Sequence, residues 1–165
     1  MHPLMLLGAG VTSAWAVYKL FFEEEELAKV FISFDFDHDR NYAYLVKAMA
    51  SNPAFESIRF RDGTPVEIKS SDIGRVKAAL TTKINQATHT LVVVGKHANA
   101  RHPDGHKIGS TNWQNWEVEQ SIKAGNKLVM VKLDNSYSAP NAAYGQNASW
   151  ARSYTVESIA AALRG

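Results

Sequence analysis

The chain has 165 residues, of which 45% are hydrophobic and 21% are charged, a composition typical of one folded domain. Its net charge of +2 comes from scattered Lys and Arg residues, without the basic stripe that nucleic-acid-binding proteins carry. The chain has no cysteine, which excludes disulfides, zinc–thiolate sites, iron–sulfur clusters and a cysteine nucleophile. We therefore expect a single folded domain and no nucleic-acid partner.

A hydrophobic segment begins the chain. Residues 3–22 carry a single charge, Lys19, and are about long enough to cross a bilayer as a helix. A membrane anchor and a helix that packs on the domain or on a second copy both fit this pattern; a cleaved signal peptide fits less well, because no Lys or Arg precedes the apolar run. If the segment crosses the inner membrane, Lys19 and Lys29 favour a cytoplasmic domain. We assign residues 1–26 to this helix with its acidic linker, and residues 27–165 to the domain.

Strand and helix patterns alternate along the first half of the domain. Residues 29–35 are rich in β-branched and apolar residues and predict a first strand. Asp39 is a candidate N-cap for a helix that ends at Asn52. A short second strand is expected over residues 57–61, and Ser71 is the expected N-cap of a long helix.

The second half continues the alternation and ends in a helix. We predict a buried strand at 90–95, a helix at 112–124, a strand at 127–133 and a helix at 155–163. The stretch from 134 to 154 is either a functional loop or holds a short strand or helix. This order predicts a parallel sheet that binds ligands at the carboxyl ends of its strands.

Three aspartates, Asp35, Asp37 and Asp39, follow the first predicted strand. Carboxylates at this edge bind Mg²⁺ in receiver-like domains that accept a phosphoryl group. Such a domain needs an acceptor aspartate at the end of the central strand, and Gly95 and Lys96 stand there instead. The simpler interpretation is that one aspartate caps the helix and the others face solvent.

Three histidines, His97, His102 and His106, share one predicted loop. Their spacing permits a metal site, but few acids lie nearby, so solvated loop histidines are the favoured interpretation. The sequence has no glycine-rich phosphate loop and no serine nucleophile elbow. We therefore predict no metal.

Trp113 and Glu117 stand four residues apart, on one face of a helix that begins at the ligand-binding edge. A carboxylate beside indole rings is partly desolvated and can stabilise a developing cation, as cleavage of a glycosidic bond requires. The alternative is that Trp113 and Trp116 are core residues and Glu117 is exposed. The spacing alone leaves both interpretations open.

Four segments carry a more specific likeness. They are KVFISF (29–34), IKSSDI (68–73), TLVVVG (90–95) and WQNWEVEQSIKAGNK (113–127). Over about residues 29–134 they resemble the TIR-like family, in the branch found among bacterial Thoeris anti-phage TIR proteins. The most specific motif is the last, in which an aromatic–Glu pair within a helix precedes SIKAGNK and a strand.

The resemblance implies a flavodoxin-like TIR fold, with a five-stranded parallel sheet in the order 2-1-3-4-5. It places the family's NAD⁺-cleaving glutamate at Glu117. The residues expected to line the pocket are Ser33, Phe34, Asp35 and Asp62, with Trp113 or Trp116 as its wall. NAD⁺ is then a substrate, and no metal or further cofactor is implied.

The resemblance also implies two different functions. Family members cleave the nicotinamide–ribose bond of NAD⁺, and some make a cyclic or conjugated ADP-ribose signal that a downstream effector reads. Others have lost catalysis and act as scaffolds. Both kinds self-associate into oligomers or filaments.

Overall fold

The computed structural model describes residues 28–52, 61–62 and 71–165. The predicted hydrophobic helix at 3–22 and most of the predicted second strand lie outside the described residues. Within the described ranges, no helix is long and apolar enough to cross a membrane.

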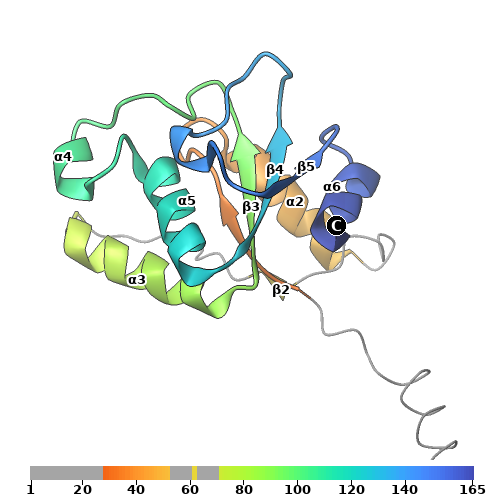
Figure 1. Cartoon of the computed structure of the whole chain (residues 1–165), viewed down its shortest axis with the longest axis horizontal. Coiled ribbons are helices and arrows are strands. Elements are labelled where there is room, and N and C mark those ends of the chain that lie inside the picture. Colours follow the sequence, from red (N-terminus) through yellow and green to blue (C-terminus); the bar gives the residue numbers. More distant parts are fainter. Residues whose placement is uncertain (1–27, 53–60, 63–70) are drawn as a thin grey trace, which may run out of the picture.

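A parallel sheet runs through the middle of the domain in the order β2-β1-β3-β4-β5 (Figure 1). Its strands are β1 (Lys29–Ser33), β2 (Arg61–Asp62), β3 (His89–Val94), β4 (Lys127–Lys132) and β5 (Ala148–Ala151). Each neighbouring pair is parallel. The order is the one that the family resemblance implied. Four strands of four to six residues form the body of the sheet, and β2 adds a two-residue edge.

Helices cover both faces of the sheet. They are α2 (Arg40–Ser51), α3 (Ile73–Gln86), α4 (Gly105–Ile108), α5 (Trp113–Ala124) and α6 (Val156–Arg164), with a short 3₁₀ turn, η2 (Asn141–Ala143). α2 and α6 lie on one face, and α3 and α5 on the other (Figure 1). The stretch 134–154, which the sequence left open, contains η2 and β5. α4 was not predicted, because a four-residue helix is too short to show periodicity.

The central strands carry apolar side chains on both faces, which places the sheet between the two layers of helices. Leu91 and Val93 of β3 point towards α2 and α6, while Val92 and Val94 point towards α5 and η2. All four are fully buried. Burial on both faces is the arrangement expected for the strands of a parallel sheet that helices cover on each side.

The observed helix caps correct two predictions. Asp72, and not Ser71, is the N-cap of α3, since its Oδ1 accepts a hydrogen bond from the Arg75 N–H at 3.1 Å. Asp39 stands at the N-cap position of α2 but makes no side-chain cap, because its carboxyl group turns towards Gly95.

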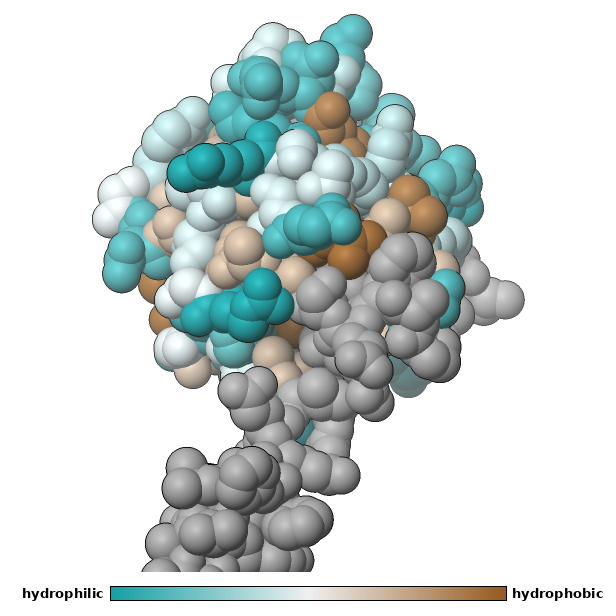
Figure 2. Space-filling view, turned by 90° about the vertical axis from the view of Figure 1, so that its right-hand side faces the viewer, coloured by the Kyte–Doolittle hydropathy of each residue, from teal (hydrophilic) through white to brown (hydrophobic). Residues whose placement is uncertain are grey.

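The solvent face over α2 and α6 is mixed in character. Figure 2, seen from the side of these helices, shows hydrophilic residues interspersed with separate hydrophobic ones. Tyr44 and Leu45 of α2 are among the exposed apolar side chains, and the Lys47 ammonium lies 5.9 Å from the Tyr44 ring centre. Scattered apolar residues of this kind are normal on a protein surface.

Candidate active site

A buried glutamate on α5 faces the end of β1. The Ser33 hydroxyl donates a hydrogen bond to Glu117 Oε2 at 2.6 Å, and Glu117 is only 9% exposed. Ser33 is the last residue of β1, and Glu117 lies one turn into α5. Sheet register and helix phase therefore bring together two residues that are 84 positions apart. The interpretation of Glu117 as an exposed helix residue is wrong.

The surroundings of Glu117 favour its neutral form. Burial raises the pKa of Glu117 from 4.5 to about 8, although the hydrogen bond from Ser33 lowers it in part. The carboxyl group therefore carries a proton in the free protein at neutral pH. A cationic ligand beside it would draw that proton off, because an adjacent positive charge favours the carboxylate. Acid groups poised in this way are typical of functional sites.

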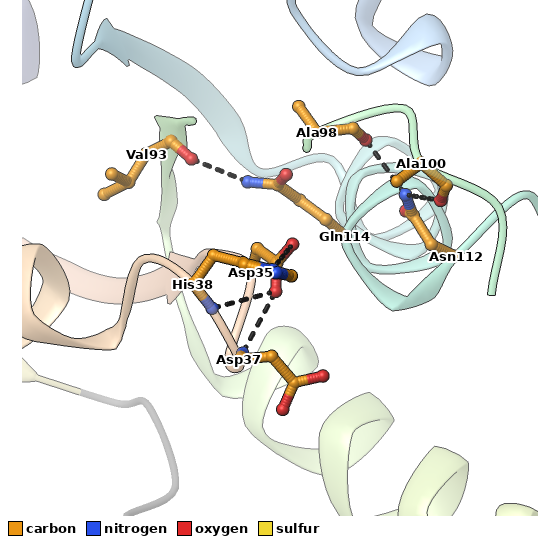
Figure 3. Close-up of polar contacts among 8 residues, drawn as sticks. All are labelled: Asp35, Asp37, His38, Val93, Ala98, Ala100, Asn112 and Gln114. Carbon is orange, nitrogen blue, oxygen red and sulfur yellow. Dashed lines mark hydrogen bonds and ion pairs between the residues drawn. The ribbon is translucent and has the colours of Figure 1, made fainter. Parts of the chain in front are cut away.

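Gln114 connects α5 to two strands. Its Nε2 donates to the Val93 carbonyl at 2.7 Å and lies 3.4 Å from the Ser33 carbonyl, which it also contacts. Figure 3 shows the Gln114 amide reaching from the first turn of α5 to the end of β3. β1 ends at Ser33 while β3 continues to Val94, and the amide supplies a donor to a carbonyl of each strand. Gln114 Oε1 is buried without a hydrogen-bond partner.

Two asparagines anchor the start of the same helix. Asn112, the N-cap of α5, accepts from the Asn115 N–H and donates through Nδ2 to the Ala98 and Ala100 carbonyls at 3.0 and 2.8 Å (Figure 3). Asn115 Nδ2 also donates to Ala98, while its Oδ1 accepts from the Ala142 N–H at 3.0 Å. These bonds tie the loop after β3 and the η2 turn to α5. The helix that carries Glu117 is thus fixed on three sides.

The turn after β1 is organised by Asp35. Its carboxylate accepts the Asp37 and His38 N–H groups at 3.0 and 3.3 Å, and it contacts His38 Nδ1 at 2.9 Å (Figure 3). The Asp35 carboxylate therefore stabilises the turn formed by residues 35–38. The described residues contain no group of three or more His, Asp or Glu that could hold a metal ion.

Asp39 is the buried member of this segment. Its carboxyl group lies against the backbone of Gly95, where a Cβ would meet Asp39 Oδ2 at 1.8 Å. Burial and the neighbouring Asp35 charge raise the pKa of Asp39, against the opposing effect of His38 and His97. Asp39 Oδ2 is buried without a partner. A side chain at position 95 would therefore displace the Asp39 carboxyl group.

The two tryptophans take unequal places. Trp116 is 6% exposed and belongs to the core between α3 and α5, whereas Trp113 is half-buried and packs edge-on against it, with ring centres 5.8 Å apart. The Lys77 ammonium lies 5.7 Å from the Trp116 ring centre. Trp113 therefore has more free surface than Trp116 with which to contact a ligand.

Two other residues, Phe34 and Asp62, were predicted to line the pocket. Phe34 packs against the core on the α2 and α6 face, opposite to Ser33. Asp62 pairs with Val30 in the register of β1 and β2, and its side chain lies outside the described residues. The structure thus brings Ser33 and Glu117 into contact and turns Phe34 away from them.

Two cavities open among the described residues, and neither Ser33 nor Glu117 lines them. One, of about 310 Å³, is lined by residues that follow β1, β3 and β4, among them His38 and His97, whose rings lie 4.2 Å apart. The other, of about 380 Å³, lies in the loop after β3 and is lined by His102 and His106. The three loop histidines of the sequence therefore separate into two places.

The family of the chain follows from comparison with known proteins. The family model described as "Thoeris protein ThsB, TIR-like domain" matches residues 31–138. The match covers more than half of the chain and includes the last three residues of β1, all of β3 and β4, and the whole of α5. This chain belongs to the Thoeris ThsB TIR-like domain family. No curated protein matches it significantly.

The TIR-like domain also contains a residue that sequence reasoning missed. Gln114 was quoted within the family motif, but no role was expected of it. A polar residue three positions before Glu117, on the same helical face, was the available signal. Only the structure shows that its amide reaches Val93 and Ser33.

Proposed function

We propose that this TIR-like domain is an NAD⁺ glycohydrolase or cyclase of bacterial anti-phage defence, with Glu117 as its catalytic residue. The observation that carries the proposal is the buried Glu117 carboxyl group held by the Ser33 hydroxyl at the end of β1. Family membership supports the same conclusion. A carboxylate placed in a desolvated site interacts strongly with positive charge that develops on a reacting ribose.

The reaction breaks the bond between ribose C1′ and the nicotinamide nitrogen. The bonding electrons leave with nicotinamide, which becomes neutral, and C1′ acquires oxocarbenium character. Water then adds to C1′ and loses a proton, which gives ADP-ribose; attack by a nitrogen of the same nucleotide gives a cyclic product. Ionised Glu117 would engage the ribose and stabilise the cationic transition state, while Ser33 holds the carboxylate in place. NAD⁺ is the substrate, and the reaction needs no metal.

Three further residues are proposed to support this chemistry. Gln114 is a positioning residue, because it fixes the first turn of α5 against β1 and β3. Trp113 lies one turn before Glu117 on α5 and offers a half-buried ring. Asp35 shapes the turn that follows Ser33. Self-association would raise the local concentration of sites, and the ADP-ribose product would be read by a downstream effector.

The test is NAD⁺ consumption by the purified full chain at high concentration, with products resolved by mass spectrometry. We expect nicotinamide release by the wild type and loss of at least a hundredfold in Glu117→Gln, since a single preorganised electrostatic group contributes about this factor. Glu119→Gln is the matched control on the same helix, because Glu119 bonds to Ser110 and not to Ser33. Equal turnover by wild type and Glu117→Gln would overturn the assignment.

The pH dependence offers an independent check. Because the pKa of Glu117 in the free protein is about 8, kcat/KM should rise with pH towards that value and level off above it. A profile that falls between pH 6 and 8 would contradict a role for ionised Glu117.

A further inference from the structure

The loop between β3 and α5 lines an open cavity that the proposed reaction does not use. It has a volume of about 380 Å³, and Arg101, His102, His106, Ser110 and Thr111 contribute to its lining. A volume of this size is within the range of small-molecule sites, about 300–1,000 Å³. The cavity is separate from the Ser33–Glu117 pair, since neither residue lines it.

The lining is dominated by hydrogen-bond donors. The Arg101 guanidinium is a fixed cation with several N–H groups suited to phosphate oxygens. His102 Nδ1 accepts the Asp104 N–H at 3.0 Å, so the hydrogen of a neutral His102 ring is on Nε2. The exposed His106 imidazole adds a third nitrogen-bearing side chain.

The nearby carboxylates are already engaged. Asp104 Oδ1 accepts from the Lys107 ammonium at 2.9 Å, and Glu119 Oε1 accepts from the Ser110 hydroxyl at 2.8 Å. Neither Asp104 nor Glu119 lines the cavity. Among the residues that line the cavity, Arg101 carries the fixed charge.

The walls are held in shape by backbone contacts. The His102 N–H donates to the Thr111 carbonyl, and the Gly105 N–H donates to the His102 carbonyl, both at 2.9 Å. At Gly105 a Cβ would lie 3.0 Å from the Ser110 carbonyl oxygen, so the two sides of the loop approach closely there. The cavity thus exists before a ligand arrives, which lowers the entropy cost of binding.

We propose that this cavity binds the phosphate groups of a phosphorylated small molecule, at a site distinct from the catalytic pair. Arg101 would form charge-assisted hydrogen bonds to the phosphate oxygens, and His102 and His106 would donate from the facing walls. The volume is large enough for a diphosphate.

Calorimetric titration of the full chain with pyrophosphate, inorganic phosphate and ADP tests the proposal. We expect pyrophosphate and ADP to bind more tightly than phosphate, and Arg101→Gln to weaken pyrophosphate binding about tenfold, as loss of a charge-assisted bond does. His106→Gln should weaken it less. Arg152→Gln is the charge-matched control, since Arg152 is exposed and lines neither cavity.

Two results would overturn the proposal. One is the absence of binding by pyrophosphate and ADP at millimolar concentration. The other is binding that Arg101→Gln and Arg152→Gln weaken equally, which would indicate diffuse charge attraction. The titration involves no turnover, and ADP or pyrophosphate bound at the Ser33–Glu117 site would not respond to Arg101→Gln, so the variant comparison separates this cavity from NAD⁺ cleavage.

Discussion

The two faces of the sheet are built in different ways. The face under α2 and α6 is packed with apolar side chains, which include Ile32, Leu91 and Ile159. Among the described residues, seven polar or charged residues are buried, and six of them lie on the α5 side: Ser33, Thr90, Gln114, Asn115, Glu117 and Ser121. One face is held by hydrophobic burial, while the other adds directional hydrogen bonds.

We expect the apolar face to contribute mainly to stability and the polar face to position the side chains of the candidate site. Apolar packing tolerates small shifts, but each buried polar group needs a partner at the right distance. The Thr90 hydroxyl donates to Ser121 Oγ at 2.8 Å and the Ser33 hydroxyl donates to Glu117 at 2.6 Å, so α5 is fixed in register along β1 and β3. Burying these polar side chains costs more desolvation free energy than burying apolar ones, but their hydrogen bonds restrict the side chains to fewer conformations.

The largest effect on stability is expected on the apolar face. Leu91→Ala removes a fully buried side chain beneath α2 and α6, and should lower the free energy of unfolding by about 2–5 kcal/mol. Urea denaturation measures this change. Leu45→Ala is the control, because Leu45 is 46% exposed, and it should change stability by less than about 0.5 kcal/mol. Similar losses in both variants would show that the apolar face is not the stabilising one.

The next effect is a pH dependence carried by Glu117. The folded pKa of about 8 exceeds the ordinary value of 4.5, so between these values the folded protein binds more protons than the unfolded chain. The stability that the neutral carboxyl contributes is complete below pH 4.5 and is lost as pH rises through about 8. Each unit of pKa shift corresponds to about 1.4 kcal/mol, so the shift from 4.5 to about 8 sets an upper bound of about 5 kcal/mol on the stability that is lost.

Chemical denaturation of wild type and Glu117→Gln at pH 5 and pH 9 measures this contribution. The amide introduced by Glu117→Gln does not titrate and can still accept the Ser33 hydrogen bond, so the variant should gain stability relative to wild type at the higher pH. Parallel pH curves for the two proteins would show that Glu117 is ionised throughout, and that burial does not raise its pKa.

Gln114 tests whether the polar face positions the catalytic group. Gln114→Met keeps the side-chain length but removes the donor to the Val93 and Ser33 carbonyls, and should cost about 1–2 kcal/mol. If the proposed reaction occurs, kcat should fall about tenfold with little change in KM, because the effect acts through Ser33 and Glu117. Unchanged kcat alongside reduced stability would assign Gln114 a purely structural role.

The sequence predicted the apolar half of the molecule better than the polar half. The runs at 29–35, 90–95 and 127–133 were apolar enough to identify β1, β3 and β4, because burial on both faces leaves an unbroken hydrophobic pattern. For residues 134–154 the sequence left a loop, a short strand and a short helix open, and it did not locate β5, since ASWA at 148–151 is short and lies in a polar stretch. A strand whose burial depends on a single neighbour leaves little trace in composition.

Within the candidate site, too, some residues could be predicted from the sequence and others could not. Family likeness selected Ser33 and Glu117, and the structure brings them into contact. The direction of Phe34 could have been predicted from strand alternation, because it follows Ser33 and points to the opposite face. The role of Gln114 could not, because side-chain amides reach backbone carbonyls only after three elements have been placed in space.

The smallest effect concerns the beginning of α3, where the cap is Asp72 and not Ser71. Asp72→Ala should cost about 1 kcal/mol through loss of the hydrogen bond from the Arg75 N–H, whereas Ser71→Ala should be nearly neutral. Asp72→Asn keeps the cap but removes the charge, and so separates capping from the 3.9 Å contact with the Arg75 guanidinium. That pair is exposed and should contribute little. Thermal unfolding of the three variants measures these differences, and a larger loss in Ser71→Ala than in Asp72→Ala would return the cap to Ser71.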